Sequence, residues 1–164
     1  MSLLPALKRQ FAHDAWARER LAAALRDLTA AEFARDFGPG FGSARAKFCH
    51  FVDAEHLWLL RVVNGESPTA RPDDNRHAAV EPFLAWLAEV QARKQAMLDS
   101  LDEPALQRVV EYRNLAGRPF RQPLWEILQH MLLHAAYHRG QVQACLRALG
   151  KQPPETDFIV FART

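Results

Sequence analysis

HMLLHAAYHRGQ, residues 130–141, places three histidines four positions apart and follows the last of them with Arg-Gly-Gln. Such a stretch fits one helix face if the apolar residues around it recur every three or four positions. They do so at Leu124, Leu128, Met131, Ala135, Val142, Leu146 and Leu149. The pattern predicts an amphipathic helix from about Pro123 to Leu149, with Gly150 as its C-cap.

The three histidines of this helix point in different directions relative to its apolar stripe. Since a step of four residues drifts by about 40°, His138 lies about 40° from the stripe centre, His134 about 80° and His130 about 120°. His134 and His138 should therefore face the interior, and His130 should lie toward the flank. A histidine pair at this spacing can place two imidazole nitrogens on one metal ion.

A metal site needs at least one more ligand, which has to come from another helix. Spacing alone leaves several candidates open, namely His13, His50, His56, Asp53 and Glu55. Without a metal, each buried imidazole lacking a partner would cost about 1–3 kcal/mol. A network of carboxylates or water is therefore the alternative to a metal.

Three further segments carry apolar residues at helical spacing. They run from Leu4 to Leu28, from about Ala44 to Val63 and from about Pro82 to Leu101. Ser43, which follows the glycine-rich stretch FGPGFGS, suits the N-cap of the second of them. Four amphipathic helices bury their apolar stripes most simply around one core, so the sequence predicts an all-α four-helix bundle.

The stretch RVVEYRNLAGRPFRQ, residues 108–122, has a different character. Its β-branched and aromatic residues flank NLAG, which predicts a short β-hairpin before the last long helix. The hairpin arginines either hold the carboxylates of an anionic ligand or are simply solvated; they are Arg108, Arg113, Arg118 and Arg121. The closing segment TDFIVFART is apolar enough to pack back on the bundle.

Composition limits the classes of protein to consider. The 164 residues, 49% of them apolar, predict a single domain over residues 1–164 with a core of its own. The formal charge is only +2 and no long run of one sign occurs, so we expect no nucleic-acid partner. Cys49 and Cys145 form no Cys-x-x-Cys pair, and no stretch matches a membrane span or a signal peptide. We expect a cytoplasmic protein without a membrane partner.

Two stretches together resemble the DinB/YfiT-like superfamily of four-helix-bundle metalloenzymes. HAAYHRGQV, residues 134–142, is similar to the family's His-x-x-x-His-Arg-Gly-Gln signature. CHFVDAEHLWLLRV, residues 49–62, is similar to its second helix, which carries a metal-binding histidine and a tryptophan. The order of elements and the closing DFIVF, residues 157–161, also fit, so the resemblance covers nearly the whole chain.

The resemblance implies a metal site formed by His50, His134 and His138. Both faces of the second helix are apolar, so its periodicity does not itself select His50 over His56. The family also implies a divalent transition metal such as nickel, zinc or manganese, a low-molecular-weight thiol as cosubstrate, a small-molecule substrate and a homodimer.

The function implied by this resemblance is that of a metal-dependent enzyme that activates a thiol or water nucleophile, of the thiol S-transferase or isomerase type. No glutamate stands between His134 and His138, so no catalytic base can be assigned. The alternatives are a non-catalytic metal-binding stress or scaffold protein, or a metal-free bundle that acts through partner contacts. Gln141 could orient a ligand, or Arg139 and Gln141 could bond to neighbouring helices. Tyr137 and Trp58 either line a pocket or belong to the core.

Overall fold

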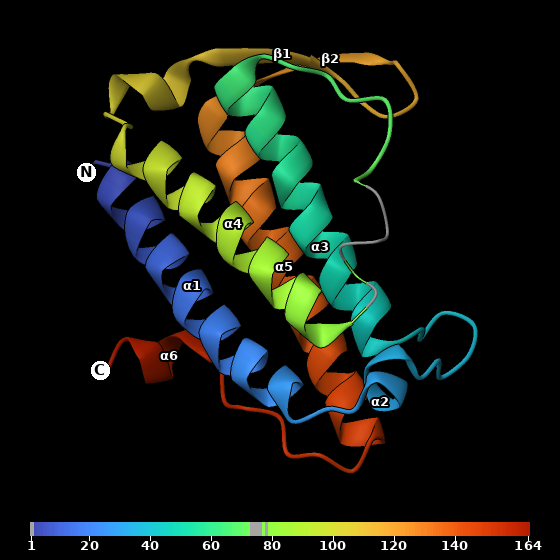
Figure 1. Ribbon diagram of the computed structural model, residues 1–164. Helices are drawn as coiled ribbons and strands as arrows, with labels where there is room; N and C mark the ends of the chain where they lie inside the picture. Colours follow the sequence, from blue (N-terminus) through green and yellow to red (C-terminus); the bar gives the residue numbers. More distant parts are fainter. Residues whose placement is uncertain (1, 73–76, 78) are drawn as a thin grey trace.

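The computed structural model describes residues 2–72, 77 and 79–164 (Figure 1). Its four long helices are α1 (Leu4–Arg26), α3 (Ala44–Leu59), α4 (Val80–Asp99) and α5 (Leu124–Ala148). They pack into one bundle, which confirms the predicted all-α four-helix architecture. None of the described helices is long and apolar enough to cross a membrane.

The bundle has two diagonal connections. α3 packs against both α4 and α5, and α1 packs against the same two helices from the opposite side. The consecutive helices α1 and α3 therefore lie across the bundle from each other, and so do α4 and α5. As a result α3 and α5, which are far apart in the sequence, lie side by side (Figure 1).

The connection from α1 to α3 contains a short helix, α2 (Ala30–Ala34), that periodicity did not predict. A reciprocal capping box begins it: Thr29 Oγ1 accepts from the Glu32 amide at 3.2 Å, and the Glu32 carboxylate accepts from the Thr29 amide at 2.8 Å. Ser43 caps α3 as predicted, because its Oγ accepts from the Ala46 amide at 3.0 Å. Lys47 Nζ reaches back to the carbonyl of Gly40 in this connection.

α3 continues as one turn of π-helix, η1 (Leu60–Asn64), and ends at Gly65. The φ of Gly65 is +70°, a left-handed conformation that glycine adopts without steric cost. The predicted end near Val63 thus agrees with the structure, but the widened last turn was not predicted.

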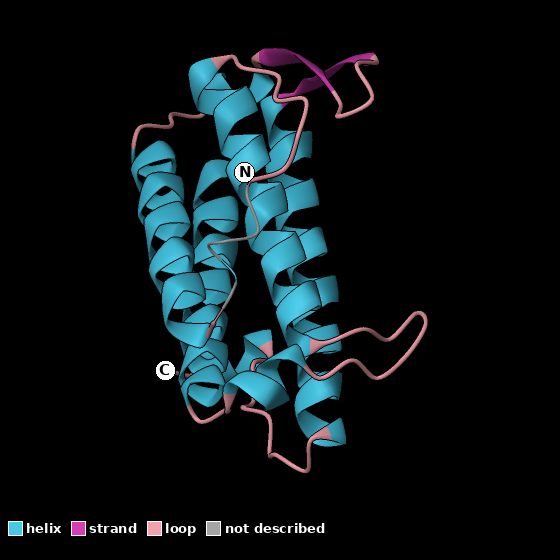
Figure 2. Cartoon of the chain, turned by 45° about the vertical axis from the view of Figure 1, so that its right-hand side comes forward, coloured by secondary structure: helices cyan, strands magenta, loops and turns pink. Residues whose placement is uncertain are grey.

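The connection from α4 to α5 carries the predicted hairpin. After a 3-10 turn, η3 (Pro104–Gln107), strand β1 (Val109–Arg113) pairs antiparallel with β2 (Pro119–Pro123). The side chain of Asn114 closes the turn, because its Oδ1 accepts from the amides of Ala116 and Arg118, each at 3.0 Å. The hairpin lies across one end of the bundle (Figure 2).

The core lies between the four long helices and is rich in phenylalanine and leucine. Phe48 and Phe51 of α3 are stacked with ring centroids 4.7 Å apart, and Phe48 also contacts Phe83 of α4 at 5.0 Å. All three rings are fully buried. Burial of each such side chain contributes about 1.5–3 kcal/mol to folding.

The closing segment packs on α1, as its apolar sequence predicts. It forms a short helix, α6 (Phe158–Phe161), whose phenylalanine rings contact α1. Phe158 lies 5.2 Å from the ring of His13, and Phe161 lies 5.8 Å from that of Trp16. Gln143 of α5 holds the preceding chain by donating to the Pro154 carbonyl at 2.9 Å.

Candidate metal centre

The adjacent helices α3 and α5 bring three histidines together. His50 comes from α3, and His134 and His138 come from successive turns of α5. Their ring centroids lie 4.4 to 5.3 Å apart, and the Nε2 atoms of His134 and His138 are separated by 3.2 Å. Each imidazole offers one nitrogen within 4.8 Å of the other two, a spacing at which all three can share one ion.

The burial of the histidines follows the order of their helical directions. His138 is buried, His134 is half-buried and His130 is exposed, as predicted from their angles to the apolar stripe. His50 is also half-buried. The group therefore lies in the wall of the bundle between α3 and α5, with one side toward solvent.

Gln141 holds the ring of His138. Its amide oxygen lies 2.7 Å from Nδ1 of that ring, three residues earlier on the same helix. Because an amide oxygen only accepts, Nδ1 carries the proton and the lone pair of His138 lies on Nε2, which faces His134. Histidine ligands of metals are commonly oriented by a second hydrogen bond of this kind.

His50 has a different partner. Nη1 of Arg71, in the connection after η1, lies 2.8 Å from its Nδ1. Since a guanidinium only donates, Nδ1 of His50 accepts here. Arg71 follows the stretch NGESPT and lies in a segment without periodicity, so no pattern in the sequence pointed to it.

The electrostatics of the group favour neutral imidazoles. Burial, assisted by the charges of Arg71 and neighbouring groups, lowers the pKa of His50 from 6.5 to about 4. Burial and the adjacent histidines lower the pKa of His134 to about 4 as well. Burial also lowers the pKa of His138, against the opposing effect of its bond to Gln141. All three rings are therefore unprotonated at neutral pH, the state in which imidazole binds a metal.

Aromatic side chains continue from this group along the α3–α5 face. The exposed ring of His130 lies 5.5 Å from His134 and 5.4 Å from Trp58, and Trp58 contacts Tyr112 of the hairpin at 4.9 Å. Tyr137 is 65% exposed beside His138, so it is not a core residue. Trp58 is only partly buried and packs at the edge of the core.

The other ligand candidates lie in separate contacts. Nε2 of His13 is 2.8 Å from the carbonyl of Thr156, and Nδ1 of His56 is 3.0 Å from the guanidinium of Arg93. Asp53 accepts from Trp86 at 3.0 Å and lies 3.1 Å from His77. None of these residues joins the three-histidine group among the residues that the structure describes.

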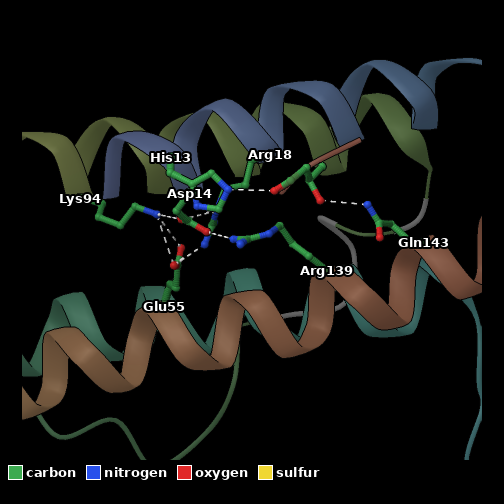
Figure 3. A network of polar contacts seen from close by, with 8 residues as sticks. His13, Asp14, Arg18, Glu55, Lys94, Arg139 and Gln143 are labelled. Atoms are coloured by element: carbon green, nitrogen blue, oxygen red, sulfur yellow. Dashed lines mark hydrogen bonds and ion pairs between the residues drawn. The ribbon is translucent and has the colours of Figure 1, made fainter. Parts of the chain in front are cut away.

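Glu55 and Arg139 belong to a network of charges buried between the four long helices (Figure 3). Asp14 of α1 accepts from Arg18 at 2.7 Å and from Lys94 of α4 at 2.8 Å, and it also pairs with Arg139 of α5. Glu55 of α3 pairs with Arg18 and Lys94. Arg139 therefore bonds to a neighbouring helix, one of the alternatives left open by the sequence, whereas Gln141 serves the histidine group.

The hairpin arginines have contacts of their own. Arg108 donates to the carbonyl of Val62 at 3.1 Å, and Arg113 donates to that of Gly117 at 2.9 Å. Arg113 and Arg121 also line an open cavity of about 610 Å³ together with Tyr112. Both a ligand-binding role and simple solvation of the hairpin arginines are compatible with these contacts.

The arrangement defines a class of protein: a four-helix bundle whose two adjacent, non-consecutive helices present three imidazoles to one point. The chain belongs to the DinB family, whose model matches residues 4–164. No curated protein sequence matches the chain.

Two solved structures share this fold. A DinB-like protein from Bacillus cereus ATCC 10987 aligns with a TM-score of 0.63 at 20% identity, covering 86% of this chain and 91% of that one. YfiT from Bacillus subtilis, described as a probable metal-dependent hydrolase with an unusual four-helix bundle topology, aligns with a TM-score of 0.64 at 18% identity, covering 89% of each chain.

Proposed function

We propose that His50, His134 and His138 bind one divalent transition metal and that the protein is a metal-dependent enzyme. The convergence of three ring nitrogens from two helices carries this proposal. Structural zinc sites use four protein ligands, whereas catalytic sites use three and keep a position for water or substrate. No fourth histidine, cysteine or carboxylate joins the group in the described part of the chain.

Three neutral imidazoles would leave the full +2 charge on the ion, which lowers the pKa of a bound thiol or water. The family resemblance supports thiol chemistry of the S-transferase or isomerase type, and the description of YfiT as a probable metal-dependent hydrolase supports water. Imidazole nitrogens suit nickel and zinc better than manganese, which favours oxygen ligands. Within this proposal Gln141 orients His138 through the 2.7 Å bond.

Metal content tests the proposal. We expect wild-type protein prepared without a histidine tag to bind about one equivalent of zinc or nickel, and we expect His50→Ala, His134→Ala and His138→Ala each to lose it. His130→Ala is the matched control, because this exposed histidine lies on the same helix outside the group. Wild-type protein that takes up neither zinc, nickel nor manganese would overturn the proposal.

A non-catalytic metal-binding scaffold is the second candidate. It is favoured by one observation: an ion shared by His50, His134 and His138 would join α3 to α5, which no short connection links. Cobalt substitution distinguishes the two roles. A visible spectrum that changes when a small thiol is added indicates an open position and supports an enzyme, whereas an unchanged spectrum supports the scaffold.

A further inference from the structure

The contact between Arg71 and Nδ1 of His50 has to break when His50 binds a metal. Arg71 only donates, so Nδ1 of His50 has to present a lone pair to it. If the metal binds at Nδ1, that lone pair is no longer free. If the metal binds at Nε2, the neutral ring carries its proton on Nδ1 and two donors face each other. In either case the guanidinium loses this partner when the metal binds.

Arg71 would then be a cation beside a divalent ion, without the one hydrogen-bond partner that its side chain has among the described residues. Its side chain lines a cavity of about 290 Å³ next to His50, which Arg45 also lines.

The described lining of this cavity offers little negative charge in return. Asp53 is the carboxylate that lines it, and this side chain already accepts from Trp86 at 3.0 Å and lies 3.1 Å from His77. Among the described lining residues, Arg45 and Arg71 therefore outnumber the single carboxylate of Asp53. An anion entering from solvent would supply the balancing charge.

We propose that Arg71 binds a carboxylate of the substrate, so that the substrate is a small carboxylate-bearing molecule held between this guanidinium and the metal centre. The inference rests on the proposed metal site and adds a substrate class to it. The planar guanidinium matches a carboxylate with two parallel hydrogen bonds. A volume of about 290 Å³ is at the lower end of small-molecule pockets, so a molecule of a few carbons fits.

Two probes of equal size test this assignment on cobalt-loaded full-length protein. 3-Mercaptopropionate and 3-mercaptopropanamide can each bind cobalt through sulfur, and they differ in whether the far end is an anion. Titration followed by the visible cobalt spectrum gives the two dissociation constants. We expect wild type to prefer the acid by about tenfold, in line with a charge-assisted hydrogen bond. We expect Arg71→Ala to lose most of this preference and Arg71→Lys to keep part of it.

Arg147→Ala is the matched control, because Arg147 is an exposed arginine of α5 nine residues beyond His138. It should keep the full preference for the acid. A preference that is the same in Arg71→Ala as in wild type would overturn the inference, since chelation of cobalt by the acid alone would then explain it. If neither probe changes the spectrum of cobalt-loaded wild type, the proposed open metal position fails as well, which separates the two failures.

A second readout needs no probe. Because Arg71 competes for Nδ1 of His50 and repels a cation, Arg71→Ala should bind zinc severalfold more tightly than wild type, as measured by competition with a chromogenic chelator. Arg147→Ala should not change the zinc affinity. Equal zinc affinity in wild type and Arg71→Ala would contradict the competition from which the inference starts.

Discussion

Gln141 and Arg139 show how two residues of one short motif act in different directions. Gln141 bonds to the ring of His138 on the wall of the bundle, whereas Arg139 pairs with Asp14 in its interior. Adjacent helix positions diverge by about 100° per residue, so neighbours in the sequence can serve separate sites. The bond to Gln141 leads to a prediction about metal affinity.

Replacement of Gln141 by Leu should weaken metal binding by roughly 10- to 100-fold without abolishing it, because the ring of His138 loses its orientation but remains a ligand. Chelator competition measures the affinity. Gln143→Leu is the control on the same helix: it loses the bond to the Pro154 carbonyl but should keep the metal affinity of wild type. A larger loss in Gln143→Leu than in Gln141→Leu would contradict the assigned role.

The histidine pKa values predict a pH dependence for the metal-free protein. His50 and His134 have a pKa of about 4 in the folded chain, against 6.5 for an ordinary histidine. Between these pH values the unfolded chain binds more protons than the folded chain. The free energy of unfolding should therefore fall as the pH decreases from 6.5 toward 4, and these two histidines should cause no loss of stability above pH 6.5.

Urea unfolding of metal-free protein across this range measures the effect. Carboxylates also titrate there, so the comparison has to be made with the double variant His50→Ala/His134→Ala. That variant should lose less stability than wild type over the same interval. Parallel profiles for the two proteins would show that these histidines contribute nothing to the pH dependence.

Some residues of the histidine group and its surroundings could be predicted from the sequence, and others could not. The His134 and His138 pair follows from helical periodicity, because a fixed angle per residue sets which side chains face inward. His50 followed from the family resemblance, since both faces of α3 are apolar. Arg71 was not predictable at all: its position depends on the path of an irregular connection, and no repeat in the sequence encodes that path.

At the level of helices, the buried charges tie all four long elements together. Three cations, Arg18, Lys94 and Arg139, face two carboxylates, Asp14 and Glu55, so the network as described carries one excess positive charge. Burial alone would raise the pKa of Asp14, but the charges of the three cations hold it well below its ordinary range. Asp14 is thus the residue on which the network depends most.

This imbalance predicts that a lost carboxylate costs more than a lost cation. Asp14→Asn should lower the free energy of unfolding by about 3–5 kcal/mol, because it leaves three buried cations with one carboxylate. Lys94→Met should cost at least about 1 kcal/mol less, since two cations and two carboxylates remain. Urea unfolding at neutral pH compares the variants. A greater loss in Lys94→Met would refute the charge argument.

The four long helices, which are stabilised by packing of an apolar stripe, were predicted from its spacing, and their predicted ends differ from the observed ends by at most about two residues when η1 is counted as the end of α3. α1 ends at Arg26, earlier than the predicted Leu28, and α4 begins at Val80, earlier than Pro82. α2 was missed because five residues are too short for periodicity. Its sequence nevertheless carried a signal, the Thr29-x-x-Glu32 spacing of a capping box.

At the scale of the whole molecule, the three-histidine group connects α3 with α5, because His50 lies on α3 and the other two histidines lie on α5. A ligand that binds only the folded chain stabilises it by about 2.7 kcal/mol when its concentration is 100 times its dissociation constant. For a chain of 164 residues this corresponds to a rise in Tm of about 5–10 °C. Zinc or nickel at that excess should therefore raise the Tm of wild type by this amount.

Thermal unfolding followed by circular dichroism, with zinc and then with a chelator, checks the rise and its reversal. His134→Ala supplies the control, because it lacks one of the three nitrogens and should show at most a small response. A rise of equal size in His134→Ala would mean that the stabilising ion binds elsewhere.

The order of the helices in the chain also determines when the three-histidine group can form. The ribosome synthesises α1, α3 and α4 before α5, and α5 supplies His134 and His138, the two residues that complete the group with His50 of α3. Until α5 has packed beside α3, a nascent chain offers only one imidazole of the three-histidine group, which is too few to hold an ion at this position. If the proposed site binds a metal, it therefore does so only once the bundle has assembled, after translation of α5.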